Sequence, residues 1–79
     1  MREYRFNTEG PEILARVTPT LEALGDQPWR VQLVDAIDGL SITDGGFYEA
    51  PSALQAATDA VEEYLVREGY KNTSFAVSL

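Results

Sequence analysis

The sequence predicts an α+β domain in which two helices pack on one face of a four-stranded antiparallel sheet. Two stretches carry apolar residues at helical spacing, and four short segments alternate apolar with polar residues. They follow one another in the order strand, helix, strand, strand, helix, strand. That order, with short connections, favours a split βαβ arrangement. A chain of 79 residues has room for one core, so residues 1–79 are expected to form a single domain.

The first half of the chain predicts a strand followed by a helix. Tyr4-Arg5-Phe6 alternates bulky and polar side chains, as a half-buried strand does. Pro11 suits the first position of a helix, and Gly25 suits the position just after its end. Pro19 lies within this predicted helix and should bend it. Between these positions an apolar stripe recurs at helical spacing: Ile13, Leu14, Val17, Leu21 and Leu24.

Two further strands are predicted in the middle of the chain. The segment 29–33 alternates apolar and polar residues, and the segment 40–43 does the same. Asp38-Gly39 is typical of a turn between such strands. Asp44-Gly45-Gly46 is expected to end the second of them.

The last third predicts the second helix and the closing strand. Ser52 starts a sequence with the spacing of a capping box, and Gly69 suits the end of the helix. The segment 75–79 alternates again and predicts a final strand. The apolar stripe of this second helix consists of Leu54, Ala57, Val61, Tyr64 and Leu65.

Composition restricts the possible functions. Thirteen acidic residues against six basic ones give a net charge of −7, which repels phosphate backbones and argues against nucleic acid as a partner. No apolar run approaches the roughly 20 residues that a membrane helix needs. The chain has no cysteine, so a cytoplasmic location is expected. An acid excess with a single lysine, Lys71, is also what a salt-rich cytoplasm favours; ordinary scatter in a small acidic domain is the alternative.

Catalytic side chains are scarce. Without histidine or cysteine, the usual general base and the thiol nucleophile are both missing. The glycines do not form a phosphate-binding loop, because no G-x-x-x-x-G-K pattern follows Gly10. The sequence therefore predicts a protein that is not an enzyme.

The order of several short motifs resembles one known family. Phe6-Asn7-Thr8, then residues 14–19 (LARVTP), then 29–33 (WRVQL) and finally Gly69-Tyr70 are similar to bacterial members of the heavy-metal-associated domain family. The resemblance covers nearly the whole chain. It implies the ferredoxin-like βαββαβ fold of small copper chaperones, with the first strand-to-helix loop as the metal site.

The metal motif of that family is missing. Aligned on Val17-Thr18-Pro19, the chain has Gly10 and Ile13 where the family has its two cysteines. Neither side chain offers a ligand atom to Cu(I) or Zn(II). The resemblance therefore implies a degenerate member without the C-x-x-C motif, and no cofactor or metal is expected.

These observations predict a non-enzymatic domain that acts through contact with another protein, as a monomer or weak dimer. By analogy with metal-carrying relatives, the contact surface is expected on the first loop together with the glycine-aromatic pair. The predicted partner-binding residues are Thr8, Glu9, Gly10, Pro11 and Tyr70.

Three alternatives remain open. Glu9 and Glu12 could hold Ca²⁺ or Mg²⁺ weakly through their oxygens, although acids are also simply favoured near a helix N-terminus. Tyr70 could form an aromatic patch with Tyr48 and Trp29, although most aromatics in so small a domain belong to the core. The chain could also be an acidic inhibitor or mimic that occupies a basic groove on another protein.

Overall fold

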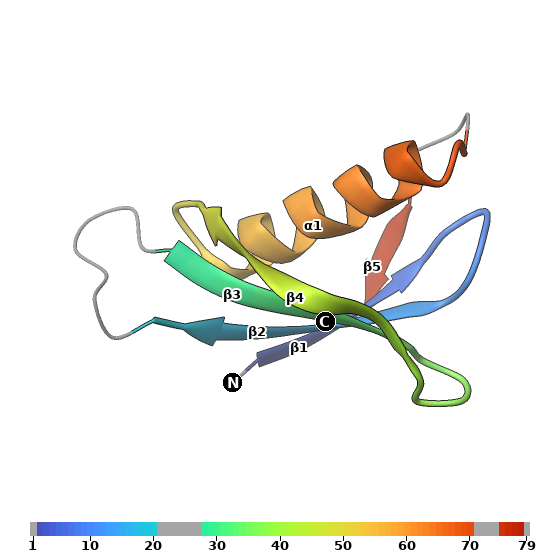
Figure 1. Cartoon of the computed structure of the whole chain (residues 1–79), viewed down its shortest axis with the longest axis horizontal. Coiled ribbons are helices and arrows are strands. Elements are labelled where there is room, and N and C mark those ends of the chain that lie inside the picture. Colours follow the sequence, from blue (N-terminus) through green and yellow to red (C-terminus); the bar gives the residue numbers. More distant parts are fainter. Residues whose placement is uncertain (1, 21–27, 71–74, 79) are drawn as a thin grey trace.

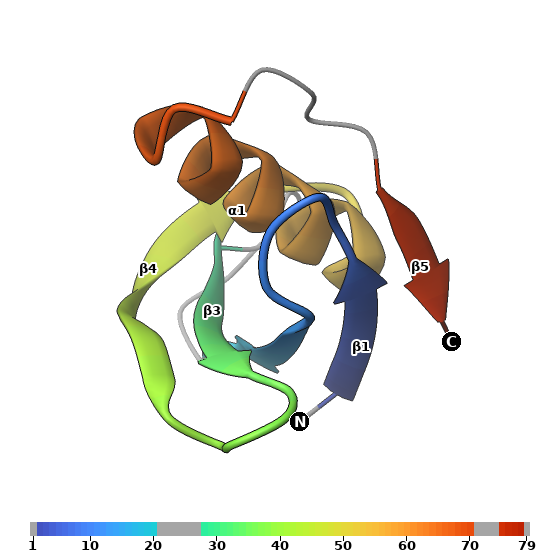
Figure 2. The same cartoon turned by 90° about the vertical axis from the view of Figure 1, so that its right-hand side faces the viewer.

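The described part of the chain forms five antiparallel strands and one helix, arranged as in Figure 1. The computed structural model describes residues 2–20, 28–70 and 75–78. The sheet has the order β4-β3-β2-β1-β5, and each neighbouring pair is antiparallel. Figure 2 shows that the sheet curls around the helix, with β4 at one margin and β5 at the other. The elements are β1 (Arg2–Asn7), β2 (Ile13–Pro19), β3 (Pro28–Asp35), β4 (Ser41–Glu49), α1 (Ala53–Arg67) and β5 (Ala76–Ser78).

The predicted βαββαβ fold with four strands and two helices is wrong, although the domain is α+β. Where the first helix was predicted, Ile13–Pro19 form strand β2, and residues 21–25 of that prediction lie outside the described residues. Ile13, Ala15 and Val17 are buried in alternation, which is the period of a strand. Pro19 therefore ends a strand and bends no helix. A mid-helix proline would cost about 3 kcal/mol.

The predicted strand at 29–33 is confirmed within β3. The strand predicted at 40–43 is confirmed from Ser41 onward, within the longer β4, and Leu40 precedes it. The expected end at Asp44-Gly45-Gly46 is wrong, because these residues lie inside β4. The predicted turn at Asp38-Gly39 is confirmed. There Asp35 Oδ1 accepts a hydrogen bond of 2.8 Å from the Ile37 amide, and Gly39 has a φ of +77°.

The predicted second helix is confirmed as α1. Ser52 is its N-cap, and the Ser52 hydroxyl accepts a hydrogen bond of 3.2 Å from the Gln55 amide. Gly69 follows the helix with a φ of +82°, a conformation that favours glycine. The closing strand predicted at 75–79 is confirmed for Ala76–Ser78, which form β5 and pair with β1. Phe75 precedes β5, and Leu79 lies outside the described residues. Among the described residues, no helix combines the length and apolar character needed to cross a bilayer.

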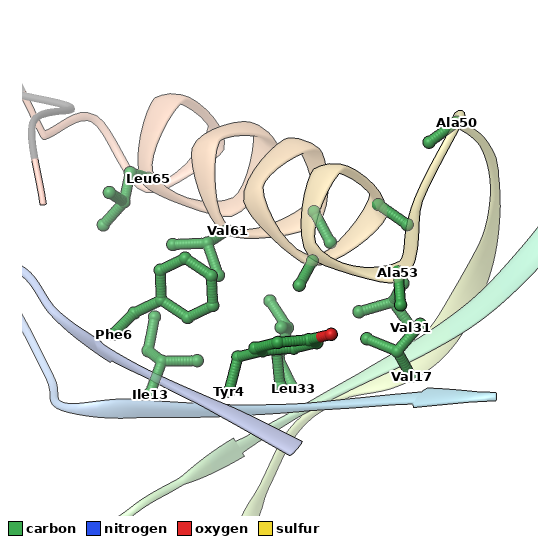
Figure 3. Close-up of a cluster of buried hydrophobic side chains, with 14 residues drawn as sticks. Tyr4, Phe6, Ile13, Val17, Val31, Leu33, Ala50, Ala53, Val61 and Leu65 are labelled. Carbon is green, nitrogen blue, oxygen red and sulfur yellow. The ribbon is translucent and has the colours of Figure 1, made fainter. Parts of the chain in front are cut away.

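The core lies between α1 and the concave face of the sheet (Figure 3). Four alanines of α1 point to the sheet and bring the helix close, while Val61 and Leu65 fill the space between them. On the sheet side, the Phe6 ring meets the Phe75 ring edge to face at 5.1 Å between centroids. The buried sheet residues around them are Tyr4, Ile13, Ala15, Val17, Val31 and Leu33. Residues between these positions in the strands must therefore point to the other face, which no described helix covers.

Candidate functional site

The face of the sheet opposite α1 carries most of the arginines. Arg5 on β1, Arg16 on β2 and Arg30 on β3 alternate with buried residues, so all three point away from the core. They are three of the five arginines in a chain whose net charge is −7. We call this surface the open face; it also contains Glu3, Leu14, Thr18, Gln32, Val34 and Phe47.

Strand register arranges the open face in rows. Arg30 lies between Thr18 of β2 and Phe47 of β4. In the next row, Arg16 lies between Gln32 of β3 and Glu3 of β1. Arg30 and Arg16 are diagonal neighbours, as are Arg16 and Arg5. Diagonal neighbours on one face lie about 7–8 Å apart, which is within reach of long side chains. The three arginines can therefore act on one ligand.

A third row crosses the open face at the other end. Leu14 lies between Val34 and Arg5. Val34 is buried and Leu14 is half-buried, so this row adds apolar surface next to the arginines. Phe47 adds a further apolar side chain at the margin and is 71% exposed.

A shallow hollow of about 110 Å³ lies between two of the rows, lined by Arg16, Thr18, Arg30 and Gln32. All four side chains can donate hydrogen bonds, and two of them are permanently charged. The only described ion pair on the open face is between Arg16 Nε and Glu3 Oε2, at 2.9 Å. Both of its side chains are about two-fifths exposed, so solvent screens the pair and a competing carboxylate can displace it.

This arrangement can bind an anion. Arginine guanidinium groups accept carboxylates in a two-pronged geometry. Leu14 and Phe47 offer apolar contact on either side of the hollow. Arginine and aromatic residues are the types enriched at protein interfaces. The open face is therefore the candidate functional site.

The partner-binding residues predicted from the sequence lie elsewhere, in the loop between β1 and β2 and after α1. Thr8 Oγ1 donates to the Pro11 carbonyl at 2.9 Å and accepts from the Gly10 amide at 3.0 Å. The Tyr70 ring packs directly over Gly10. The structure thus brings Tyr70 to this loop, but their contacts are internal to the fold. Glu9 is the exposed member of the set, and the role of the loop stays a prediction.

Glu9 and Glu12 flank the same loop and do not lie at a helix N-terminus as expected, because the predicted first helix is strand β2. In the stretches 2–20, 28–70 and 75–78, no three side chains of the kinds that bind metals come together. Two carboxylates are too few for a tight calcium site. The proposed cation site gains no support from this geometry.

The three aromatic residues of the suggested patch, Tyr70, Tyr48 and Trp29, lie at different positions along α1, and the Tyr48 side chain lines a hollow with Glu63 and Tyr64. Trp29 and Tyr48 are neighbours across β3 and β4, and Trp29 Nε1 donates to the Ala50 carbonyl at 3.0 Å, before the helix starts. Tyr70 follows the end of the helix. All three pack against the core, so they do not form one surface patch.

Burial raises the pKa of the hydroxyl of Tyr48, with Glu63 as the next cause, and it raises the pKa of Tyr64 likewise. Because the folded-state pKa lies above the unfolded value of 10.0, the contribution of these two hydroxyls to stability is complete below pH 10 and is lost as pH rises through the folded pKa.

We expect the melting temperature of the protein to fall above pH 10. The double variant Tyr48→Phe/Tyr64→Phe should show a shallower fall. Equal slopes in thermal scans at pH 8 to 11 would contradict this.

Sequence reasoning missed the open face. The signal was present, because each of Arg5, Arg16 and Arg30 has an apolar residue on both sides in its own segment. The register that gathers them depends on residues 13–19 being a strand, which the helical interpretation excluded.

Comparison with known proteins adds no relative. No protein-family model, no curated protein and no solved structure matches this chain. The resemblance to heavy-metal-associated domains thus stays an untested sequence observation, and the fold that it implied is wrong.

Proposed function

We propose that this chain is a non-enzymatic binding protein whose open face receives an acidic segment of a partner protein. One observation carries the proposal. In a strongly acidic chain, three of five arginines stand on one exposed sheet face, one on each of three neighbouring strands. If these arginines served solubility alone, they would be spread over the surface and would not gather on one face.

The size of the face favours a protein over a nucleic acid. Tight binding to a phosphate backbone uses about 6–10 contacts, whereas the open face offers three arginines, one of them already paired with Glu3. Phosphates would also meet the repulsion of the net charge of −7. Two or three carboxylates match the three guanidinium groups.

The apolar side chains on the open face specify the partner further. Phe47 stands beside Arg30 in one row, and Leu14 stands beside Arg5 in another. We therefore expect an acidic segment that also carries an aromatic or aliphatic residue, since aromatic and arginine anchors dominate protein interfaces.

Selection from a random peptide library tests this proposal. The wild-type chain and the variant Arg16→Glu/Arg30→Glu serve as parallel baits. Peptides enriched on the wild type should be rich in Asp and Glu, and should bind the variant at least tenfold more weakly, about 1.4 kcal/mol. Arg67→Glu is the matched control, because Arg67 lies on α1 beside Glu63 and away from the open face.

Two results would contradict the proposal. One is an enriched set without excess acid, or one that binds both baits equally. The other is tighter binding of a single-stranded oligonucleotide than of the best peptide in the same buffer, which would assign the open face to nucleic acid.

A further inference from the structure

The outer edge of β4 and the side of α1 form a groove on a different part of the molecule from the open face. Among the described residues, β4 pairs with β3 alone, so one side of Ser41–Glu49 keeps its backbone groups unpaired. An unpaired strand edge is a template for a further strand. Since α1 lies beside the margin of the sheet that β4 forms (Figure 2), an added strand would meet side chains of the helix as well.

Two hollows lie at this groove. The smaller, of about 130 Å³, is lined by both apolar and polar side chains. The larger, of about 410 Å³, lies along the outer side of α1 and is lined by residues of α1. Both are lined by Glu63 and Arg67, so they lie next to each other. The smaller hollow is lined by Leu33, Thr43, Gly46, Tyr48, Ala60, Glu63, Tyr64 and Arg67.

Gly46 keeps the smaller hollow open on the sheet side. It lies within β4 and does not have a positive φ, so its backbone would accept any residue. A Cβ added there would meet its nearest neighbour, Tyr48 Cε2, at 3.4 Å, which is ordinary contact. The glycine is thus not needed for the fold at this point, but a side chain there would enter the hollow.

The wall of the groove is acidic. Asp59, Glu62 and Glu63 line the larger hollow against a single base, Arg67. Arg67 Nη2 already pairs with Glu63 Oε1 at 2.7 Å. This leaves Asp59 and Glu62 without a described cation beside them, and the groove attracts positive charge.

We propose that an extended, basic segment of another protein adds to the edge of β4 as a further strand, with one small aliphatic side chain in the smaller hollow. Backbone pairing with an edge strand supplies affinity, and pockets for alternate side chains supply selectivity. Lysine or arginine side chains of the segment would lie opposite Asp59 and Glu62. The proposal is independent of the open face, whose ligand is acidic.

A peptide titration of the full chain, followed by NMR, tests this proposal. The probe is the heptapeptide Ser-Lys-Ser-Val-Ser-Lys-Ser, in which the valine and both lysines share the face of the added strand that meets α1. The main control is the same peptide with its central Ser-Val-Ser N-methylated, which removes amide donors from both edges of the strand. The unmodified peptide should shift the amide signals of β4 and α1 and slow hydrogen exchange in β4. The methylated peptide should bind at least tenfold more weakly.

Variants of the chain locate the site. Gly46→Val should weaken binding at least tenfold, because the added side chain fills the smaller hollow. Asp59→Asn/Glu62→Gln should weaken it several-fold, with the larger effect at low salt. Arg30 lies on the open face, so Arg30→Gln should leave the affinity for the peptide unchanged. Thermal melts of each variant confirm that the fold is retained.

Four outcomes would overturn the proposal. The first is that millimolar peptide shifts no amide signals, and the second is that the methylated peptide binds equally well. The third is that the shifts are confined to β1–β3. The fourth is that, without peptide, the protection of β4 from hydrogen exchange depends on protein concentration. The last would make a second copy of this chain the occupant of the edge.

Discussion

Phe6→Ala is expected to cost most of the stability of this domain, about 3–5 kcal/mol of the free energy of unfolding. Phe6 is fully buried on β1, and its ring meets Phe75 edge to face. A domain of this size has a total stability near the lower end of about 5–15 kcal/mol. Urea unfolding followed by the fluorescence of Trp29, the one tryptophan, measures the loss. If the variant is already unfolded in the absence of urea, the loss exceeds the total stability of the domain.

The matched control is Phe47→Ala, the same chemical change at a side chain that is 71% exposed. Substitutions at the surface away from special features usually change stability by less than about 0.5 kcal/mol. Phe6→Leu keeps most of the apolar volume and should recover a large part of the loss. Similar losses for Phe6→Ala and Phe47→Ala would mean that the core does not lie between β1 and α1.

The segment 13–19 shows why residue spacing predicted the wrong element there. Ile13 and Val17 are apolar at both helical and strand spacing, so they cannot distinguish the two. The choice between helix and strand depended on two residues. Leu14 extends the helical stripe, whereas Ala15 extends the strand alternation. The larger Leu14 dominated the pattern, yet the structure buries Ala15 fully and leaves Leu14 half-buried. Contacts with β1 and β3 decide this, and local spacing does not contain them.

Elements whose signals are local were predicted correctly. Ser52 and Gly69 mark the ends of α1 through capping chemistry that acts within one turn. The Asp38-Gly39 turn is similarly local, with Gly39 at positive φ. The open face is the opposite case, because it needs three strands in register before its arginines meet. One wrong element was therefore enough to hide the candidate site.

Gly10→Ala is expected to destabilise the domain by about 1–3 kcal/mol through overpacking. A Cβ at this position would lie 2.9 Å from Tyr70 Cε1 and closer still to the end of the ring. The Tyr70 ring is partly buried and packs against the core, which opposes its withdrawal. In an unconstrained loop, glycine to alanine would instead stabilise by about 0.4–1 kcal/mol, by restricting the unfolded chain. The sign of the change in urea unfolding thus reports whether the contact is present.

A double-mutant cycle with Tyr70→Ala separates the ring from the backbone. Once the ring is removed, Gly10→Ala should cost less than about 0.5 kcal/mol, so the two changes should couple by at least about 0.5 kcal/mol. Gly46→Ala is the matched control, since its added Cβ would meet only ordinary contact. If Gly10→Ala costs as much without the ring as with it, the strain lies in the loop backbone between β1 and β2. Tyr70 would then not hold that loop against the end of α1.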